Sequence, residues 1–234
     1  NCSCGRFVEI WNLVFTQYDQ KPDGSRVPLP RPNIDTGMGL ERTTAIVQGK
    51  NNVYETDLFA APLALVSSLC GKRYGDVQAT DRAMRIVVEH GRGMAFLVAD
   101  GVLPTNEGRG YVLRRILRRA SLFGRRLGLT QPFLTTVTSD TIKRMGETYP
   151  ELVQQSQLIH DVVEAEEKRF LATLETGMGI VDDLVEKALS KGHVTLSGAD
   201  VFRLYDTYGF PRELTAEVAR ERGLTIDVEG FDKA

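Results

Sequence analysis

The period of two along residues 7–18 predicts a strand with two largely apolar faces. One face carries Val8, Ile10, Asn12 and Val14, and the other carries Phe7, Trp11, Leu13 and Phe15. Asn12 is the polar member of its face. A buried amide costs about 1–3 kcal/mol unless it finds hydrogen-bond partners. Asn12 therefore either bonds to neighbouring backbone or points at a ligand.

Turn and proline signals fill residues 21–32 and predict a turn followed by an extended connection. Ile34 then leads into the stretch Asp35–Arg42 (DTGMGLER), where two glycines stand one residue apart. A helical run follows from about Leu40 to Gly49. We therefore expect a tight glycine turn between a strand and a helix.

From residue 57 onward the apolar positions recur with helical spacing. The predicted helices cover residues 58–69, 81–98, 111–123, 138–149, 156–189, 197–205 and 213–222. Gly91 and Gly93 are expected to weaken the second of these by about 1 kcal/mol each. Gly177 and Gly179 predict a kink or break in the longest one.

The change of pattern near residue 56 divides the chain. Its 234 residues, 42% of them hydrophobic, suffice for a sizeable core in one or two domains. We expect an α+β fold, with strands and the glycine turn in residues 1–56 and a mostly helical domain in residues 57–234. The chain begins at Asn1 rather than Met, inside a predicted strand region, which suggests a segment of a longer protein.

The stretch Asp35–Arg42 carries candidate binding chemistry. Glycine permits close approach of the backbone to a ligand, and a helix N-terminus offers free N–H groups to an anion. Asp35 can hold a cation, and Arg42 can hold a phosphate or stack on a base. The third glycine of GxGxxG is missing and no GxxxxGK[ST] loop occurs, which excludes two common nucleotide fingerprints. On spacing alone, a plain turn with Asp35 as a cap and Arg42 at the surface is the commoner arrangement.

The formal net charge is −2, but the charge is unevenly distributed. Residues 101–139 hold seven arginines against Glu107 alone, an excess of six positive charges. Residues 140–190 hold five basic and eleven acidic residues. The basic block predicts a face that binds a polyanion.

The basic block centres on one helix face and the loop before it. The helix carries Arg114, Arg115, Arg118 and Arg119, and the loop carries Asn106 and Arg109. The four helical arginines have no nearby acidic partners in the sequence, and arginine suits bidentate phosphate contacts. Nucleic acid on this helix, with Asn106 at a base edge, is one interpretation, and a solvated surface is the other. Asp206 lies beside an aromatic turn and either caps a helix or accepts from a base amino group.

Other side chains narrow the chemistry. Three cysteines cannot form a disulfide framework in a chain of this length, and Cys2 and Cys4 are interpreted as free thiols, with metal binding as the alternative. The three histidines lack metal-ligand spacing, so no metal site is expected. No apolar run approaches the ~18 residues of a membrane span, and no signal peptide is seen. We therefore expect a reducing, cytoplasmic compartment and no membrane partner; the oligomeric state is not indicated.

Five segments resemble one enzyme family: residues 7–15, 35–42, 54–59, 106–120 and 205–211. In this order, and almost from end to end, the chain is similar to alanyl-tRNA synthetases, which are class II aminoacyl-tRNA synthetases. The resemblance implies the C-terminal part of the class II antiparallel sheet, followed by a helical tRNA-recognition domain.

For the first domain, the resemblance implies a site for L-alanine and ATP. The implied alanine contacts are Asn12, Val14, Asp35 and Gly37, and the implied ATP contacts are Gly37, Gly39 and Arg42. The Asp35–Arg42 stretch is similar to motif 3, with Arg42 on the adenine and phosphates and Asp35 on the ammonium group. Asn12 would hydrogen-bond the amino acid, and Val14 and Gly37 would wall a pocket for one methyl group. Asp35 and Arg42 are the catalytic candidates, and Mg²⁺ would accompany ATP.

For the helical domain, the resemblance implies binding of tRNA-Ala. Asn106 and Asp206 match the positions that read a G·U wobble pair in the acceptor stem. The side chains implied on the RNA backbone are Arg109, Arg114, Arg115, Arg118 and Arg119.

The chain departs from the family pattern at several points. Thr16 and Thr105 replace the usual Met and Ser, and Gly91 and Gly93 stand where the family prefers helix formers. Motifs 1 and 2, the editing domain with its zinc site and the C-terminal domain are expected to be absent, so the chain alone is expected not to form the adenylate. Two alternatives stay open: a non-catalytic module that binds the acceptor stem, and a structural helical fragment with solvated arginines.

Overall fold

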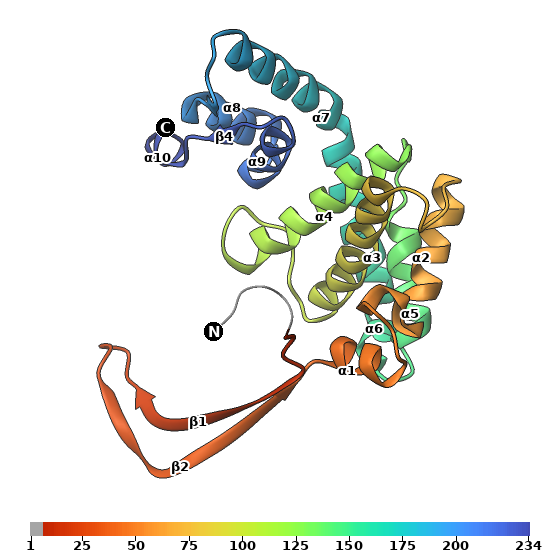
Figure 1. The fold of residues 1–234 in the computed structure, drawn as a ribbon, viewed down its shortest axis with the longest axis vertical. Helices are drawn as coiled ribbons and strands as arrows, with labels where there is room; N and C mark the ends of the chain where they lie inside the picture. The colour runs from red at the N-terminus through yellow and green to blue at the C-terminus, as the bar shows by residue number, and fades with distance from the viewer. Residues whose placement is uncertain (1–6) are drawn as a thin grey trace. The chain divides into compact units, whose positions relative to one another are not determined.

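The computed structural model describes residues 7–234. Its contacts divide the chain into one unit that extends to Ala61 and a second, larger unit from Pro62 to Ala234. Strands occupy the first unit and helices dominate the second, as Figure 1 shows, so the predicted α+β fold is confirmed.

The first unit is built on an antiparallel hairpin of β1 (Trp11–Gln20) and β2 (Arg26–Met38). Its turn closes through the Lys21 N–H, which donates to the Ser25 carbonyl at 2.9 Å. The predicted extended connection over residues 21–32 is wrong from Arg26 onward, because β2 already begins there. The register of the hairpin shifts between Thr16 and Tyr18, opposite the proline-containing part of β2. Proline lacks the N–H that a regular ladder needs, which accounts for the shift.

Beyond β2, a short helix α1 (Leu40–Val47) and a 3₁₀ turn η1 (Val53–Glu55) complete the first unit. The predicted tight glycine turn is wrong: β2 runs through Gly37, which is paired with Asn12. Gly39 is the N-cap of α1 with an extended backbone, at φ −74° and ψ 115°. The chain therefore passes from strand to helix without a left-handed residue.

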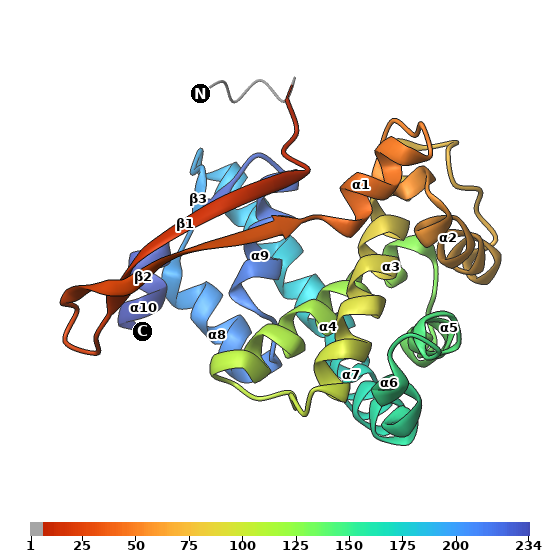
Figure 2. The same ribbon diagram turned by 90° about the horizontal axis from the view of Figure 1, so that it is seen from below.

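The second unit contains a bundle of helices. They are α2 (Asp57–Cys70, which begins before the division), α3 (Gln78–Ala99), α4 (Gly108–Leu127), α5 (Leu134–Met145), α6 (Pro150–Gln154) and α7 (Ser156–Ser190). Helix α3 packs on α4 and α5, and both α4 and α5 pack on α7, which Figure 2 shows from below. Periodicity predicts each of the long helices, with boundaries that differ by a few residues.

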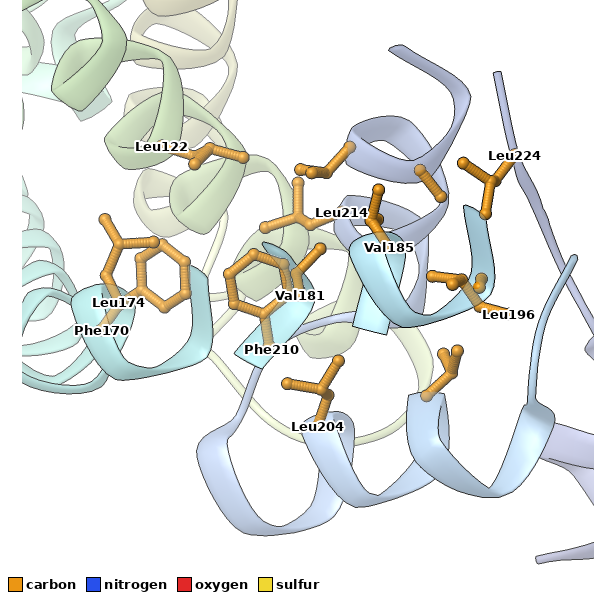
Figure 3. Packing of buried hydrophobic residues seen from close by; sticks show 14 residues of the cluster. Leu122, Phe170, Leu174, Val181, Val185, Leu196, Leu204, Phe210, Leu214 and Leu224 are labelled. Atoms are coloured by element: carbon orange, nitrogen blue, oxygen red, sulfur yellow. The ribbon is translucent and has the colours of Figure 1, made fainter. Parts of the chain in front are cut away.

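The remaining elements pack on the C-terminal half of α7. They are β3 (Thr195–Leu196), α8 (Gly198–Tyr208), α9 (Arg212–Glu221), β4 (Thr225–Ile226) and α10 (Val228–Lys233), with β3 and β4 paired in parallel. Figure 3 shows their shared core, in which Phe210, from the segment between α8 and α9, lies beside Phe170 of α7 with ring centroids 6.1 Å apart. The predicted turn over residues 206–211 is partly helix, because α8 continues to Tyr208.

Helix α7 runs for 35 residues without a break, so the break predicted as one alternative at Gly177 and Gly179 is wrong. Gly177 is buried, and a Cβ atom there would lie 2.9 Å from Cδ2 of Phe210. The glycine thus makes room for an aromatic ring, and packing on that ring offsets the low helix propensity.

A buried acid joins α7 to α5. The Glu167 carboxylate accepts the Phe133 N–H at 3.1 Å and the Leu134 N–H at 3.0 Å, at the N-terminus of α5. A side-chain acceptor from another helix thus satisfies N–H groups that have no partner within α5. Burial raises the pKa of Glu167 to about 7, although both hydrogen bonds lower it.

Two glycines in α3 have opposite surroundings. A Cβ atom on buried Gly91 would lie 3.4 Å from Cβ of Val137 and well inside van der Waals contact with Cγ1 of the same side chain. The nearest atom to a Cβ on Gly93 would be Cδ1 of Ile116, at 3.8 Å. Gly91 thus permits the close approach of α3 and α5, whereas Gly93 has room for a methyl group.

We therefore expect Gly91→Ala to lower the free energy of unfolding by about 1–3 kcal/mol, because Val137 is buried and β-branched and cannot move aside. Gly93→Ala is expected to raise it by up to about 1 kcal/mol through helix propensity. Urea denaturation followed by circular dichroism measures both values, and the Gly93 variant serves as the matched control. Equal destabilisation by the two substitutions would contradict this account of the helix packing.

Candidate functional site

The hairpin brings four predicted site residues onto one face. Asn12 pairs directly with Gly37, and Val14 pairs directly with Asp35. Residues opposite each other in a ladder point to the same side, and so do residues two apart in a strand. The side chains of Asn12, Val14 and Asp35 and the bare backbone of Gly37 therefore share one exposed surface.

Gly37 lies close to the amide of Asn12. A Cβ atom at position 37 would lie 3.1 Å from Oδ1 of Asn12, tighter than ordinary contacts. The Asn12 amide Nδ2 donates to Oε1 of Glu9 at 3.1 Å. Any larger residue at position 37 would therefore push against an amide that is already held from its other side.

Arg42 also reaches toward this end of the hairpin. Its Nη1 donates to the Glu9 carbonyl at 2.7 Å, and the Gly39 N–H donates to the Ile10 carbonyl at 3.1 Å. Gly39 is the N-cap of α1 and has no side chain, so no N-cap side chain accepts from the first N–H groups of that helix. The Asp35 Oδ1 accepts the Thr36 N–H at 2.8 Å, which leaves its second oxygen exposed. A guanidinium, a helix N-terminus and a carboxylate therefore lie within one short segment.

The arginines of α4 are arranged differently from the prediction. They form ion pairs with acids of α7 and α9: Arg114 and Arg118 with Glu166, Arg115 with Glu213, Arg119 with Glu217, Arg125 with Glu175 and Arg126 with Glu221. The expectation that they lack acidic partners is therefore wrong, and so is the alternative of a merely solvated face. Their partners lie 48 or more positions away along the chain, which spacing along one helix does not indicate.

Exposure separates these arginines. Arg118 is buried, with 8% of its side chain exposed, and Arg114 retains 14% and Arg115 38%. Burial lowers the pKa of Arg118 from its usual value, and Glu166 offsets part of that shift. Arg109, before the paired positions, is exposed and forms no ion pair within residues 7–234.

A pocket of about 220 Å³ brings together residues that are 100 positions apart. It is lined by Asn106, Tyr111, Arg114, Arg118, Arg169, Tyr205, Asp206, Gly209 and Pro211. Asn106 and Asp206 thus face one hollow, and both are exposed. Arg114 donates to Oδ1 of Asn106 through Nη1, so the amide nitrogen of Asn106 is left as the outward group.

Sequence reasoning missed the acids that shape this region, chiefly Glu166, Glu213 and Glu217. The available signal for Glu166 was the acidic block of residues 140–190, whose excess of negative charge mirrors the basic block, but Glu213 and Glu217 lie outside that block. Tyr111 adds to the same network, because its hydroxyl donates to Glu213 at 2.7 Å. Burial, followed by this bond, raises the pKa of Tyr111.

Further findings concern metal ligands, membrane-spanning helices and cysteines. Within residues 7–234, no three His, Cys, Asp or Glu side chains are grouped as metal ligands, and no helix is long and apolar enough to cross a membrane. The predicted free thiols of Cys2 and Cys4 lie outside the described residues. Cys70 is a free, half-buried thiol.

Comparisons with known proteins decide the family. The model of the family described as tRNA synthetases class II (A) matches residues 1–234. The chain belongs to this class II synthetase family. It is 54% identical over 232 residues to an alanine–tRNA ligase of Dehalococcoides mccartyi, 48% over 233 residues to one of Pelotomaculum thermopropionicum and 47% over 233 residues to one of Desulfosudis oleivorans.

These matches cover 99–100% of this chain but only 26–27% of each relative. The chain therefore spans about a quarter of the length of the curated synthetases that it matches. The resemblance found in the sequence is thus confirmed at the level of the family.

His90 contacts one of the α4 arginines, and its titration makes the free energy of unfolding depend on pH. Its Nε2 lies 3.0 Å from Nη1 of Arg119 and accepts from it. Burial, followed by the charge of Arg119, lowers the pKa of His90 to about 4, although Glu217 raises it. Because this value lies below the ~6.5 of an unfolded chain, the unfolded state binds more protons between about pH 4 and 6.5. Stability from this group is therefore present above pH 6.5 and lost as the pH falls toward 4.

We expect His90→Gln to lose less stability than the parent between pH 7 and pH 4.5, by a difference on the order of 2–3 kcal/mol. Urea denaturation at both pH values measures it. Glu167, with its raised pKa, contributes in the opposite direction, but both proteins share it, so it cancels in the comparison. An identical pH dependence in the two proteins would show that His90 titrates as an exposed histidine.

Proposed function

We propose that this chain is the part of an alanine–tRNA ligase that combines one wall of the aminoacyl-adenylate site with the reader of the tRNA acceptor stem. The observation that carries the proposal is the pocket lined by both Asn106 and Asp206 in a chain that belongs to the synthetase family. The relatives are alanine–tRNA ligases, which supports the choice of amino acid and of tRNA-Ala. A cytoplasmic location follows as part of the same proposal.

In the first unit, the exposed face of the hairpin fits a small amino acid. Asp35 would accept from the ammonium group of alanine, and Asn12 would bond to the amino acid. Val14 and the bare backbone of Gly37 would leave space for one methyl group, since a Cβ at Gly37 already crowds Asn12. A larger amino acid would meet these walls, which gives selectivity by exclusion.

ATP fits the neighbouring end of the hairpin. The guanidinium of Arg42 would stack on the adenine and hold a phosphate, and the N-terminus of α1 would offer N–H groups to the phosphates. The described residues supply no carboxylate cluster for a resident metal, so Mg²⁺ is proposed to arrive on the phosphates of ATP. The alanine carboxylate would then attack the α-phosphate, and pyrophosphate would leave. A 3′-terminal ribose hydroxyl of the tRNA would next attack the alanyl carbonyl, and AMP would leave. These residues position and neutralise charge rather than form a covalent bond.

In the second unit, the pocket offers one donor and one acceptor. The Asn106 amide nitrogen can donate to a base acceptor, and the Asp206 carboxylate can accept from a base amino group. Arg109 and the partly exposed Arg115 are the arginines of this region best placed to hold phosphates, because the donors of Arg118 are engaged by Glu166 and Gly209 and the Nη donors of Arg114 by Asn106 and Pro104. The alternative function, a non-catalytic module that binds the acceptor stem, would use this same pocket.

We expect the chain to bind an acceptor-stem hairpin of tRNA-Ala with its G·U pair more tightly than the same hairpin with G·C. Asn106→Ala and Asp206→Asn are each expected to reduce this preference by about fivefold or more, because one base contact is lost. Filter binding at fixed salt measures the affinities. Asp200→Asn, in the first turn of the same helix as Asp206, is the control and should keep the preference. Equal binding of both hairpins by the parent would refute specific reading of the pair.

We expect the chain by itself to show no ATP–pyrophosphate exchange with alanine. The proposed ATP contacts of the described first unit lie on one exposed wall and include a single arginine, Arg42, against a triphosphate that carries several negative charges. Exchange assays with radiolabelled pyrophosphate and Mg²⁺ test this, with Arg42→Ala as the blank. Robust, Arg42-dependent exchange would establish the chain as a complete adenylating unit.

A further inference from the structure

We infer that Glu166 is a positioning residue for acceptor-stem recognition: one buried carboxylate sets the separation of Asn106 and Asp206 through two arginines. The inference rests on the proposed function, because it concerns how the two proposed base readers are held. It adds a residue of α7 that faces neither the RNA nor the solvent.

Glu166 is the centre of the arrangement. Only 4% of its side chain is exposed. Its Oε1 accepts from Nε and Nη2 of Arg118 at 2.8 and 2.6 Å, and it lies 3.2 Å from Nε of Arg114. One oxygen therefore joins two successive turns of α4 to α7, with hydrogen bonds to Arg118 and with an ion pair, but no hydrogen bond, to Nε of Arg114.

The first arm leads to Asn106. Arg114 donates from Nη1 to Oδ1 of Asn106 and from Nη2 to the Pro104 carbonyl at 3.4 Å. Because the amide oxygen is occupied, the amide nitrogen is the group that Asn106 presents. Arg114 thus fixes both the place of the loop and the direction of the amide.

The second arm leads to Asp206. Arg118 donates from Nη1 to the Gly209 carbonyl, just after α8 ends. Asp206 lies in the last turn of that helix, three residues before Gly209. Its exposed carboxylate makes no hydrogen bond or ion pair with the described residues, so its place is set by the backbone that Arg118 holds.

The two arms meet at the buried carboxylate of Glu166. A buried carboxylate shared by two guanidiniums is costly to separate from either one. Arg169, 3.9 Å from Oε2 of Glu166 and 70% exposed, stands at the rim and contributes little to this clamp. The donor of Asn106 and the acceptor of Asp206 are therefore held at one spacing before any RNA arrives, as preorganised recognition requires.

The test compares Glu166→Gln with Glu175→Gln. Glu175 is the matched control, because it lies on the same helix and pairs with Arg125 of α4, away from the pocket and 75% exposed. Hydrogen exchange is followed in residues 104–107 and 206–210, with α5 as the internal reference. Hairpin RNAs with a G·U or a G·C pair are bound by the same proteins at fixed salt.

We expect Glu166→Gln to speed exchange in both segments by about tenfold or more, with α5 unchanged, and to lower the G·U preference by about fivefold or more. Binding of the G·C hairpin should stay within about twofold, since phosphate contacts are untouched. Unchanged exchange in both segments, or a full G·U preference in the folded variant, overturns the inference. A parent without any G·U preference would refute the proposed function alone, and the exchange rates would still decide the role of Glu166.

Two further variants keep the test decisive if Glu166→Gln does not fold. Arg114→Lys and Arg118→Lys keep the charge beside Glu166 but lose the forked guanidinium that bridges two partners. Arg114→Lys should loosen residues 104–107 only, and Arg118→Lys residues 206–210 only, each with a reduced G·U preference. If either variant loosens both segments equally or neither of them, the two-armed clamp is wrong.

Discussion

The interaction on which the second unit depends is the neutralisation of the α4 arginines by acids from other helices. Helix α4 carries six arginines that form ion pairs, and the partners come from α7 on one side and α9 on the other. Where such a pair is buried, as at Arg118 and Glu166, removal of one partner costs about 3–5 kcal/mol, whereas the intact pair adds little net stability over an apolar one. The pairs therefore specify which helix faces are joined, while the apolar cluster around Phe170 and Phe210 supplies the burial.

A single aromatic ring shows how closely these charges are packed. The guanidiniums of Arg82, Arg119 and Arg126 lie 4.7–5.3 Å from the centroid of the Phe123 ring. The carboxylates of Glu217 and Glu221 bridge the same arginines, so α3, α4 and α9 share one network. Three like charges on one ring are tolerated because two acids stand between them.

Local patterns predicted most of the helical unit, because helix periodicity and capping are encoded within a few turns. They failed where a residue far away in the sequence determines the local structure. The prolines before Asn33 suggested a connection, yet residues 26–28 pair with Tyr18, Asp19 and Gln20, so this segment is a strand with an interrupted register. Gly177 suggested a break, yet Phe210 fills the space that it leaves. The arginines looked unpaired because Glu166 and Glu217 lie 48 and 98 positions beyond Arg118 and Arg119. The grouping of Asn12, Val14, Asp35 and Gly37 came from the family resemblance; spacing alone favoured a plain turn.

The length of α7 has a consequence for how this chain can vary. An uninterrupted helix of 35 residues spans about 50 Å, and each added residue rotates everything beyond it by about 100°. Glu166 and Glu167 occupy successive positions about one third of the way along it and contact α4 and α5, while Val181 and Val185 pack in the C-terminal core. One residue inserted or deleted between these two sites would therefore rotate one set of side chains away from its partners. Sequence change along α7 is consequently limited to substitution, whereas length change belongs to the loops at its two ends.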